Sequence, residues 1–361
     1  MTADDTDSGE LALSDRKKGN SVRTQVERAG IALTGVLAVL MITFLVVDWV
    51  RTTPLGIAVY AEGIFTQYLV LGAWLDYYLG TNVFWIASTW RAIATGVLIG
   101  VVAPMVGTFL VHRQMALIGE TLAHTAFAGV AVGIIVVAFV GWTGSLLLVA
   151  LIVSALGALG LQWLTDRTNS YGDVPIAIVL SGSFAIGTLL ISWGRSFAPI
   201  TVDVEGFLFG SIAIVTASGA RLMAVLSVAV VAVVVYNYKQ FFFITFDERA
   251  ARVARLDVDR YNTIMIVMTA VVVVGAMQIL GVILVAAMLV VPAATASLLA
   301  YSFRETLYLS ILIGQFSVLV GLGISLLGSL PPGGSIVIVG IACYLIAVLV
   351  SDRSPSGMAL H

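Results

Sequence analysis

The sequence predicts an all-α polytopic membrane protein, and both its composition and its long apolar stretches point to that class. Hydrophobic residues make up 60% of the 361 residues, whereas charged residues make up only 11%. Soluble domains carry about 25% charged residues, so this composition suits a lipid environment. Many of the apolar stretches reach the ~20 residues that a helix needs to cross a bilayer. The single cysteine, Cys343, lies in one of them and excludes a disulfide framework.

The N-terminal region divides into a tail, a span and an aromatic segment. Residues 1–28 are polar and end in basic residues, which predicts a solvated tail. The apolar run Ala29–Val50 has the length of a first membrane span. Residues 51–91 are rich in Tyr and Trp, which favour the membrane–water interface. We expect one or two helices at the outer surface there, with a dip of residues 63–75 into the bilayer as the alternative.

Further apolar runs predict the remaining spans. Together with the first span they give about ten transmembrane helices, or eight to nine if the shorter runs are re-entrant. Several runs are rich in glycine, a composition that lets helices pack closely. The expected spans are Ala92–Val111, Leu117–Val140, Thr143–Leu164, Val174–Trp193, Leu222–Tyr236, Tyr261–Met277, Leu280–Tyr301, Leu307–Leu327 and Ser335–Val350.

Lysine and arginine are unequally divided between the two sides that these spans define. Fourteen of the 18 fall on the side of the N-terminal tail, and four fall on the other side, namely Arg51, Arg91, Arg195 and Arg221. The more basic side of a membrane protein is normally cytoplasmic. We therefore expect a chain of the cell membrane with both termini in the cytoplasm.

One acid and one histidine interrupt the apolar run of residues 115–133. Glu120 and His124 are four residues apart, which places both side chains on one face of a helix. Such groups are costly in hydrocarbon unless they face a partner, water or an ion, and a carboxylate with an imidazole suits a divalent transition metal. The pair is either a metal site or a hydrogen-bonded pair between helices. Gly129 and Gly133 form a GxxxG pair, which predicts the close approach of another helix.

The largest polar stretch between spans covers residues 239–260 and lies on the expected cytoplasmic side. Thr245 and Glu248 match an S/T-x-x-E capping box, so a short helix over residues 245–257 is expected to begin there. This segment is either an ordinary surface loop or a docking helix for a cytoplasmic partner. A docking helix joined to two spans would transmit a partner's motion to them.

Three common catalytic signatures are absent from the chain. There is no GxxxxGK[ST] phosphate loop, so the chain does not bind and hydrolyse ATP by that device. Neither HExxH nor GxSxG occurs, which argues against one type of zinc metalloprotease and one common serine-hydrolase elbow. We therefore expect no enzymatic activity.

Four segments carry a resemblance to a known family. They are VGTFLVHRQMALIGETLAHTAFAGVAVG (106–133), FLFGSI (207–212), ITFDERAARVARLDV (244–258) and GVILVAAMLVVPAATASLLA (281–300). In composition and order they resemble segments of the permease subunit of metal-ion ABC importers, the zinc, manganese and iron uptake family often called ABC-3. The chain departs from that family's pattern at Glu120, where Asp is usual, at His112, where Arg is usual, and within 244–258.

The resemblance implies a division of the chain and a mechanism. Residues 90–351 would form an ABC importer permease-like bundle, preceded by an extra span and outer segment at 29–89 and followed by a cytoplasmic tail at 352–361. Two permease chains, expected as a homodimer, would enclose the ion pathway. Two ATPase subunits would dock below, and an extracellular binding protein would deliver the ion. ATP binding and hydrolysis would then switch the pathway between outward and inward access.

The resemblance also assigns roles to residues. Glu120 and His124 match the family's acid and histidine that contact the metal inside the membrane. The chain would bind no cofactor and no nucleic acid, and a divalent metal ion, zinc or manganese, would be its substrate. Coupling to the ATPase would fall on Thr245, Phe246, Asp247, Glu248, Arg249 and Arg252.

Two acids on the expected outer side form a further candidate. Asp203 and Glu205 precede the FLFG element and would concentrate cations at an outer mouth, or they are solvated loop charges. The alternatives to an importer are a gradient-driven secondary transporter, an intramembrane enzyme and a structural assembly partner. The first would need more titratable groups in the membrane, and the second a nucleophile or a fuller metal shell.

Overall fold

The computed structural model describes residues 29–54, 56–140, 146–167, 174–194, 204–211 and 215–351. Within these ranges every regular element is a helix and no strand occurs. Nine of the described helices are long and apolar enough to cross a membrane. This confirms the predicted all-α class, and the shorter apolar helix α12 accounts for the tenth expected span.

The helices follow the predicted apolar runs closely, with bounds that usually extend a few residues beyond them. In chain order they are the N-terminal helix Ala29–Val50, α2 Ala58–Leu79, α3 Ala87–His112, α4 Ala116–Val140, α5 Leu146–Arg167, α6 Val174–Gly194, α7 Val204–Phe209, α8 Ala217–Tyr236, α9 Tyr238–Phe246, α10 Glu248–Val253, α11 Val258–Leu280, α12 Val285–Leu299, α13 Phe303–Gly328 and α14 Pro332–Val350.

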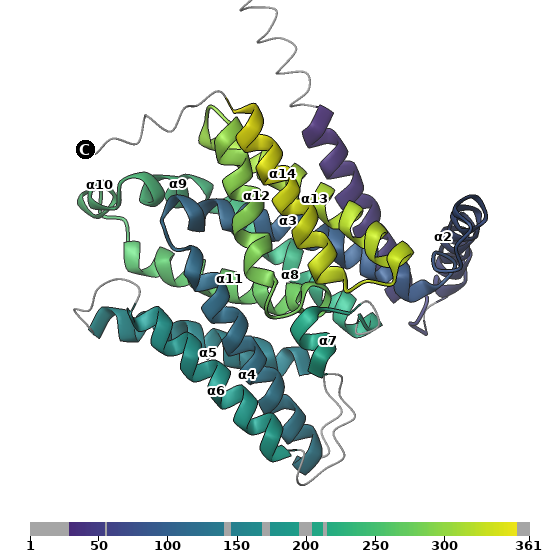
Figure 1. Cartoon of the computed structure of the whole chain (residues 1–361), viewed down its shortest axis with the longest axis horizontal. Helices are drawn as coiled ribbons and strands as arrows, with labels where there is room; N and C mark the ends of the chain where they lie inside the picture. The colour runs from purple at the N-terminus through teal and green to yellow at the C-terminus, as the bar shows by residue number, and fades with distance from the viewer. Residues whose placement is uncertain are drawn as a thin grey trace, which may run out of the picture.

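Helix α3 forms the centre of the bundle, and 89% of its most apolar stretch is buried inside the protein. It packs against α8, α11, α12 and α13. Helices α4, α5 and α6 form a layer along one edge, whereas the N-terminal helix lies at the opposite edge (Figure 1). Because successive spans alternate in direction, the α3–α4 turn, α9 and α10 share one end of the bundle, which we call the α10 end. The other end, with α2 and α7, is called the α2 end.

The aromatic segment after the first span forms a single helix, α2, at the margin of the molecule (Figure 1). Phe65 of α2 stacks on Phe44 of the N-terminal helix, with ring centroids 5.7 Å apart. The loop that follows α2 is organised around the buried Asp76, whose carboxylate accepts hydrogen bonds from four groups. The donors are the Thr81 hydroxyl and the backbone N–H groups of Val83, Phe84 and Trp85, at 2.6 to 3.0 Å.

The FLFG element is seated tightly against the turn between α11 and α12. Gly210 and Gly281 both have positive φ, 82° and 76°, a backbone conformation that favours glycine. A Cβ added at Gly210 would lie 1.9 Å from the Ile279 carbonyl oxygen, so no side chain fits there. The Ile283 N–H donates to the Leu208 carbonyl at 3.3 Å. These contacts fix the short helix α7 to the α2 end of α11.

The predicted capping box in the polar stretch is wrong. Thr245 lies inside α9, where its hydroxyl donates to the Phe241 carbonyl at 2.7 Å. The next helix, α10, begins at Glu248, and the Asp247 side chain caps it by accepting from the Ala250 N–H at 2.8 Å. Phe241 is fully buried against Phe109 of α3, and this packing extends α9 through Thr245. Aspartate, which is at least as good an N-cap as threonine, then takes the cap position.

Candidate functional site

Helix α4 carries Glu120 and His124 on one face, and both residues are half-buried. The helix is held closely by both of its neighbours. A Cβ added at Gly129 would lie 2.7 Å from the Ala150 Cα atom of α5, and one added at Gly187 of α6 would lie 2.8 Å from the Phe127 ring. The predicted close approach at the GxxxG pair is thereby confirmed, and the rigid packing fixes where the pair points.

The imidazole of His124 meets α6 through an aromatic contact rather than a hydrogen bond. Its ring stands edge-on to Phe184, with centroids 5.1 Å apart and planes at 78°. The Nδ1 atom is buried and has no hydrogen-bond partner within the part of the chain that the structure describes. Glu120 lies close enough for its charge to act on the imidazole, yet it forms no hydrogen bond or ion pair with any described residue. A carboxylate and a ring nitrogen are therefore left open to a cation.

Two donors do not make a complete metal shell. Among the described residues, no group of three or more His, Cys, Asp and Glu side chains could hold a metal ion. A structural zinc site uses about four protein ligands, and manganese prefers about six donors, mostly oxygen. The pair on its own therefore suits a brief contact with a passing ion, which has to bind and leave again.

A charged network at the α10 end joins the consecutive helices α10 and α11 to the α3–α4 turn, which is distant from them in sequence. Glu248 of α10 pairs with Arg113 of the α3–α4 turn at 3.7 Å and with Arg252 at 3.0 Å, and Arg252 reaches Asp259 of α11 at 3.0 Å. Burial lowers the pKa of the Arg113 guanidinium, and the charge of Glu248 opposes that effect. The network fixes α10 to the turn from which α4 begins.

A cavity of about 380 Å³ opens beside this network, at the foot of α4. It begins within about one helical turn of Glu120, since Ile118 and Met115, two and five residues before Glu120, line it. Sequence reasoning missed this cavity because its lining residues come from the α3–α4 turn, α4, α5, α6, α10 and α11, and no local motif connects them. The polar residues that line it are Gln114, Gln162, Thr165, Glu248, Arg252, Asp259 and Asn262.

The remaining predicted site residues fall into two groups. Phe246, Asp247, Arg249 and Arg252 are exposed at the α10 end, while Thr245 points into α9 as described above. Asp203 lies outside the described residues, and the side chain of Glu205 is also outside them although its backbone belongs to α7. The structure therefore brings the residues predicted to couple to an ATPase together around α9 and α10, while their role and the outer mouth both stay predictions.

Comparison with known proteins places this bundle in a family. The model of the ABC 3 transport family matches residues 86–351. The chain is 30% identical over 265 residues to the manganese transport system membrane protein MntC of Listeria monocytogenes, covering 73% of this chain and 90% of that protein. It is also 30% identical over 265 residues to the manganese import system permease protein ScaB of Streptococcus gordonii, covering 73% and 91%.

A solved structure gives the same result. PsaBC from Streptococcus pneumoniae, in complex with a Fab, is 29% identical and superposes with a TM-score of 0.66, covering 74% of this chain and 93% of that chain. The N-terminal helix and α2 precede the residues that the family model matches. The chain belongs to the ABC 3 transport family.

Proposed function

We propose that this chain is the membrane permease subunit of an ATP-driven importer of a divalent metal ion. The observation that carries the proposal is the half-buried pair of Glu120 and His124 inside an apolar span. The Nδ1 atom of His124 has no hydrogen-bond partner among the described residues. Manganese is the first candidate because the relatives are named as manganese transport proteins, and zinc is the second because imidazole and carboxylate suit it as well.

The position of the pair supports a pathway between two copies of the chain. Helices α5 and α6 expose large apolar side chains beside it, among them Leu156 at 62% and Leu189 at 69%. In a single chain Glu120 and His124 would lie at this lipid-facing edge, where an ionisable group is costly. A second copy placed against α4–α6 would cover the edge and supply further donors to a passing ion.

The α10 end supports docking of a separate ATPase. Phe246 is 57% exposed and Val253 is 85% exposed, and both stand among the basic residues of α9 and α10. Exposed apolar side chains within a polar rim are typical of a protein interface. Movement of a docked ATPase would reach the foot of α4 through the Glu248–Arg113 pair. An extracellular binding protein would deliver the ion at the opposite end, where Asp203 and Glu205 are candidates for the outer mouth.

Reconstitution tests this proposal. The permease, its ATPase and its binding protein are placed in proteoliposomes, and manganese, zinc and iron uptake are compared with and without ATP. We expect uptake of manganese or zinc only with ATP and only with the binding protein present. Uptake driven by an ion gradient without ATP would contradict the proposal and favour a secondary transporter.

A cysteine at Arg252 tests the sidedness. In a Cys343→Ser background, Arg252→Cys should react with a membrane-impermeant reagent from the cytoplasm only and should cross-link to the ATPase. Labelling from outside the cell would overturn the proposed orientation of every span.

A further inference from the structure

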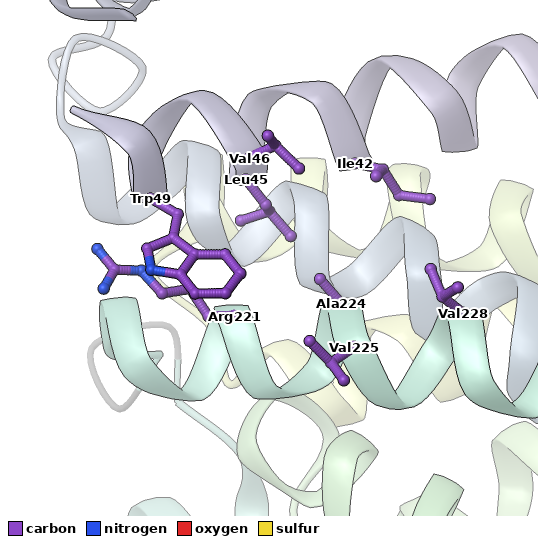
Figure 2. Close-up of a pocket in the computed structure, with 8 residues that line it drawn as sticks. All are labelled: Ile42, Leu45, Val46, Trp49, Arg221, Ala224, Val225 and Val228. Atoms are coloured by element: carbon purple, nitrogen blue, oxygen red, sulfur yellow. The ribbon is translucent and has the colours of Figure 1, made fainter. Parts of the chain in front are cut away.

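The N-terminal helix, which lies outside the family match, forms an apolar groove with α8 (Figure 2). The groove has a volume of about 230 Å³ and is lined by four residues between Ile42 and Trp49 and by four between Arg221 and Val228. All of them are apolar except Arg221, which reaches toward Trp49 at one end of the groove (Figure 2). A seven-residue separation on each helix makes the groove about 10 Å long, most of the depth of one bilayer leaflet.

Arg221 is held in place, but no carboxylate neutralises it. Its Nη2 atom donates to the Thr52 hydroxyl at 3.0 Å and to the Asp48 backbone carbonyl at 3.4 Å. Its Nε atom is buried without a hydrogen-bond partner, and it forms no ion pair with any described residue. A guanidinium has five N–H donors, so most of its hydrogen-bonding capacity is unused.

The neighbouring acids are already engaged by other arginines. The carboxylate of Asp48 receives Arg91 at 2.9 and 3.0 Å and Arg51 at 3.0 Å. Glu62 lies 3.5 Å from Arg51. Among the described residues, three guanidinium groups therefore face two carboxylates at this end of the groove, and one positive charge is left over, on Arg221.

We propose that the groove is a binding site for one anionic phospholipid. Its phosphate pairs with the guanidinium of Arg221, and one of its acyl chains lies between the N-terminal helix and α8. Guanidinium binds phosphate strongly, and Trp49 beside it is the residue type that marks the lipid headgroup level. The lipid fills the space between the N-terminal helix and α8 and neutralises the guanidinium of Arg221.

The groove is separate from the surface that we assign to the second permease copy. The N-terminal helix lies at the edge of the molecule opposite α5 and α6 (Figure 1), and both walls of the groove are membrane-crossing helices. Bilayer lipid is therefore the molecule in contact with this surface. The inference does not depend on which ion the permease carries.

Native mass spectrometry of the purified full-length chain tests the site. The protein is delipidated in detergent and titrated with phosphatidylglycerol, with phosphatidylcholine and inorganic phosphate as separate probes. We expect one phosphatidylglycerol to be retained per chain, in preference to phosphatidylcholine, and not to be displaced by inorganic phosphate. Arg221→Gln should lower the affinity for phosphatidylglycerol by about tenfold, because loss of a hydrogen bond to a charged group weakens binding by that factor.

Two tryptophan variants on one face of α8 provide the matched control. Val228→Trp fills the groove and should lower phosphatidylglycerol retention, whereas Val235→Trp lies two turns farther along the same face, outside the groove, and should leave it unchanged. These two variants test the site even if Arg221→Gln fails to fold.

Three results would overturn the inference. One is equal retention by the wild type and a folded Arg221→Gln variant, and another is an equal effect of the two tryptophans. The third is efficient disulfide cross-linking between two copies carrying Val225→Cys in a Cys343→Ser background, which would show that a second chain covers the groove.

Discussion

Asp48 and Asp76, near the α2 end of the bundle, are surrounded by donors, whereas Glu120 and His124 of α4 are not. Asp48 is 1% exposed and receives two arginines, and Asp76 receives one hydroxyl and three backbone N–H groups. Glu120 has no such donor among the described residues, and the buried Nδ1 atom of His124 has none.

Under the proposed function, this difference separates a structural role from a transport role. Buried polar groups that only support a fold are normally satisfied, because an unsatisfied one costs about 1–3 kcal/mol. A pair that has to bind and release an ion cannot be saturated by protein groups. The two kinds of site should therefore respond in opposite ways to substitution, the first through stability and the second through transport.

The largest effect is expected from His124→Ala. Mutation of a residue that hydrogen-bonds to a metal ligand typically lowers metal affinity or activity by about 10- to 100-fold. Loss of the ligand itself should therefore reduce uptake by at least about tenfold. The stability cost should stay near 1 kcal/mol, the value of the contact with Phe184. Uptake in proteoliposomes and thermal unfolding in detergent measure the two effects. Uptake close to the wild type for every metal would remove this residue from the pathway.

Arg91→Ala should behave in the opposite way. Removal of Arg91 takes away the two-point contact of the buried Asp48 carboxylate and leaves it only the single contact with Arg51, at a cost of up to about 3 kcal/mol. We expect a lower unfolding midpoint and proteolytic release of the N-terminal helix, while the metal affinity of the folded fraction stays unchanged. Arg51→Ala is the control and should cost less, because Asp48 keeps its two-point contact with Arg91. Equal stability of all three proteins would show that this ion pair does not hold the helix.

Asp76→Asn should lower the free energy of opening of the loop between α2 and α3 by about 1.5–3 kcal/mol, the range for hydrogen bonds to a charged group. Burial would raise the pKa of Asp76, but the hydrogen bonds from Thr81, Phe84, Val83 and Trp85 outweigh it, so the pKa lies below its ordinary value. A lowered folded pKa gives stability that is present above the unfolded pKa and is lost as the pH falls through the folded pKa.

Hydrogen exchange of the backbone N–H groups of residues 83–85 measures this effect. Opening free energies, after correction for the intrinsic exchange rate, should be constant from pH 7 to pH 5 and should fall only below about pH 4, near the unfolded pKa of aspartate. A fall between pH 7 and pH 5 would contradict this account of Asp76.

The smallest effect is expected at the α10 end. Asp247→Ala removes the N-cap of α10 and should cost about 1 kcal/mol, whereas Thr245→Ala should cost less because Thr245 caps nothing. The ATPase affinity should fall in the first variant and stay near the wild type in the second. A larger effect of Thr245→Ala than of Asp247→Ala would show that Thr245, and not Asp247, caps α10, as the sequence predicts.

The spans and the Glu120–His124 pair could be predicted from the sequence because both depend on local patterns. An apolar run of sufficient length forms a spanning helix almost regardless of context, and a four-residue spacing fixes a shared face. The tight packing at Gly129 follows from the same kind of pattern.

Contacts between distant segments could not be predicted in this way. Asp48 and Arg91 are 43 residues apart, and Arg113 meets Glu248 only because α3, α9 and α10 converge at one end. The local capping signal misplaces the start of α10, because the burial of Phe241 against α3 extends α9 past that signal. In each case tertiary packing decides between alternatives that the local sequence leaves open.

Electron spin echo spectroscopy of bound Mn²⁺ tests the central claim most directly, namely that His124 contacts the ion. The chain has three histidines, so a nitrogen coupling can be assigned by substitution. The permease and ATPase are purified without a histidine tag, nucleotide or binding protein, and loaded with Mn²⁺. We predict an imidazole nitrogen coupling that is lost in His124→Gln and kept in His112→Gln, whose ring already bonds the Thr108 carbonyl through Nδ1. A coupling that survives in His124→Gln, or one that disappears only in His112→Gln, would contradict the account.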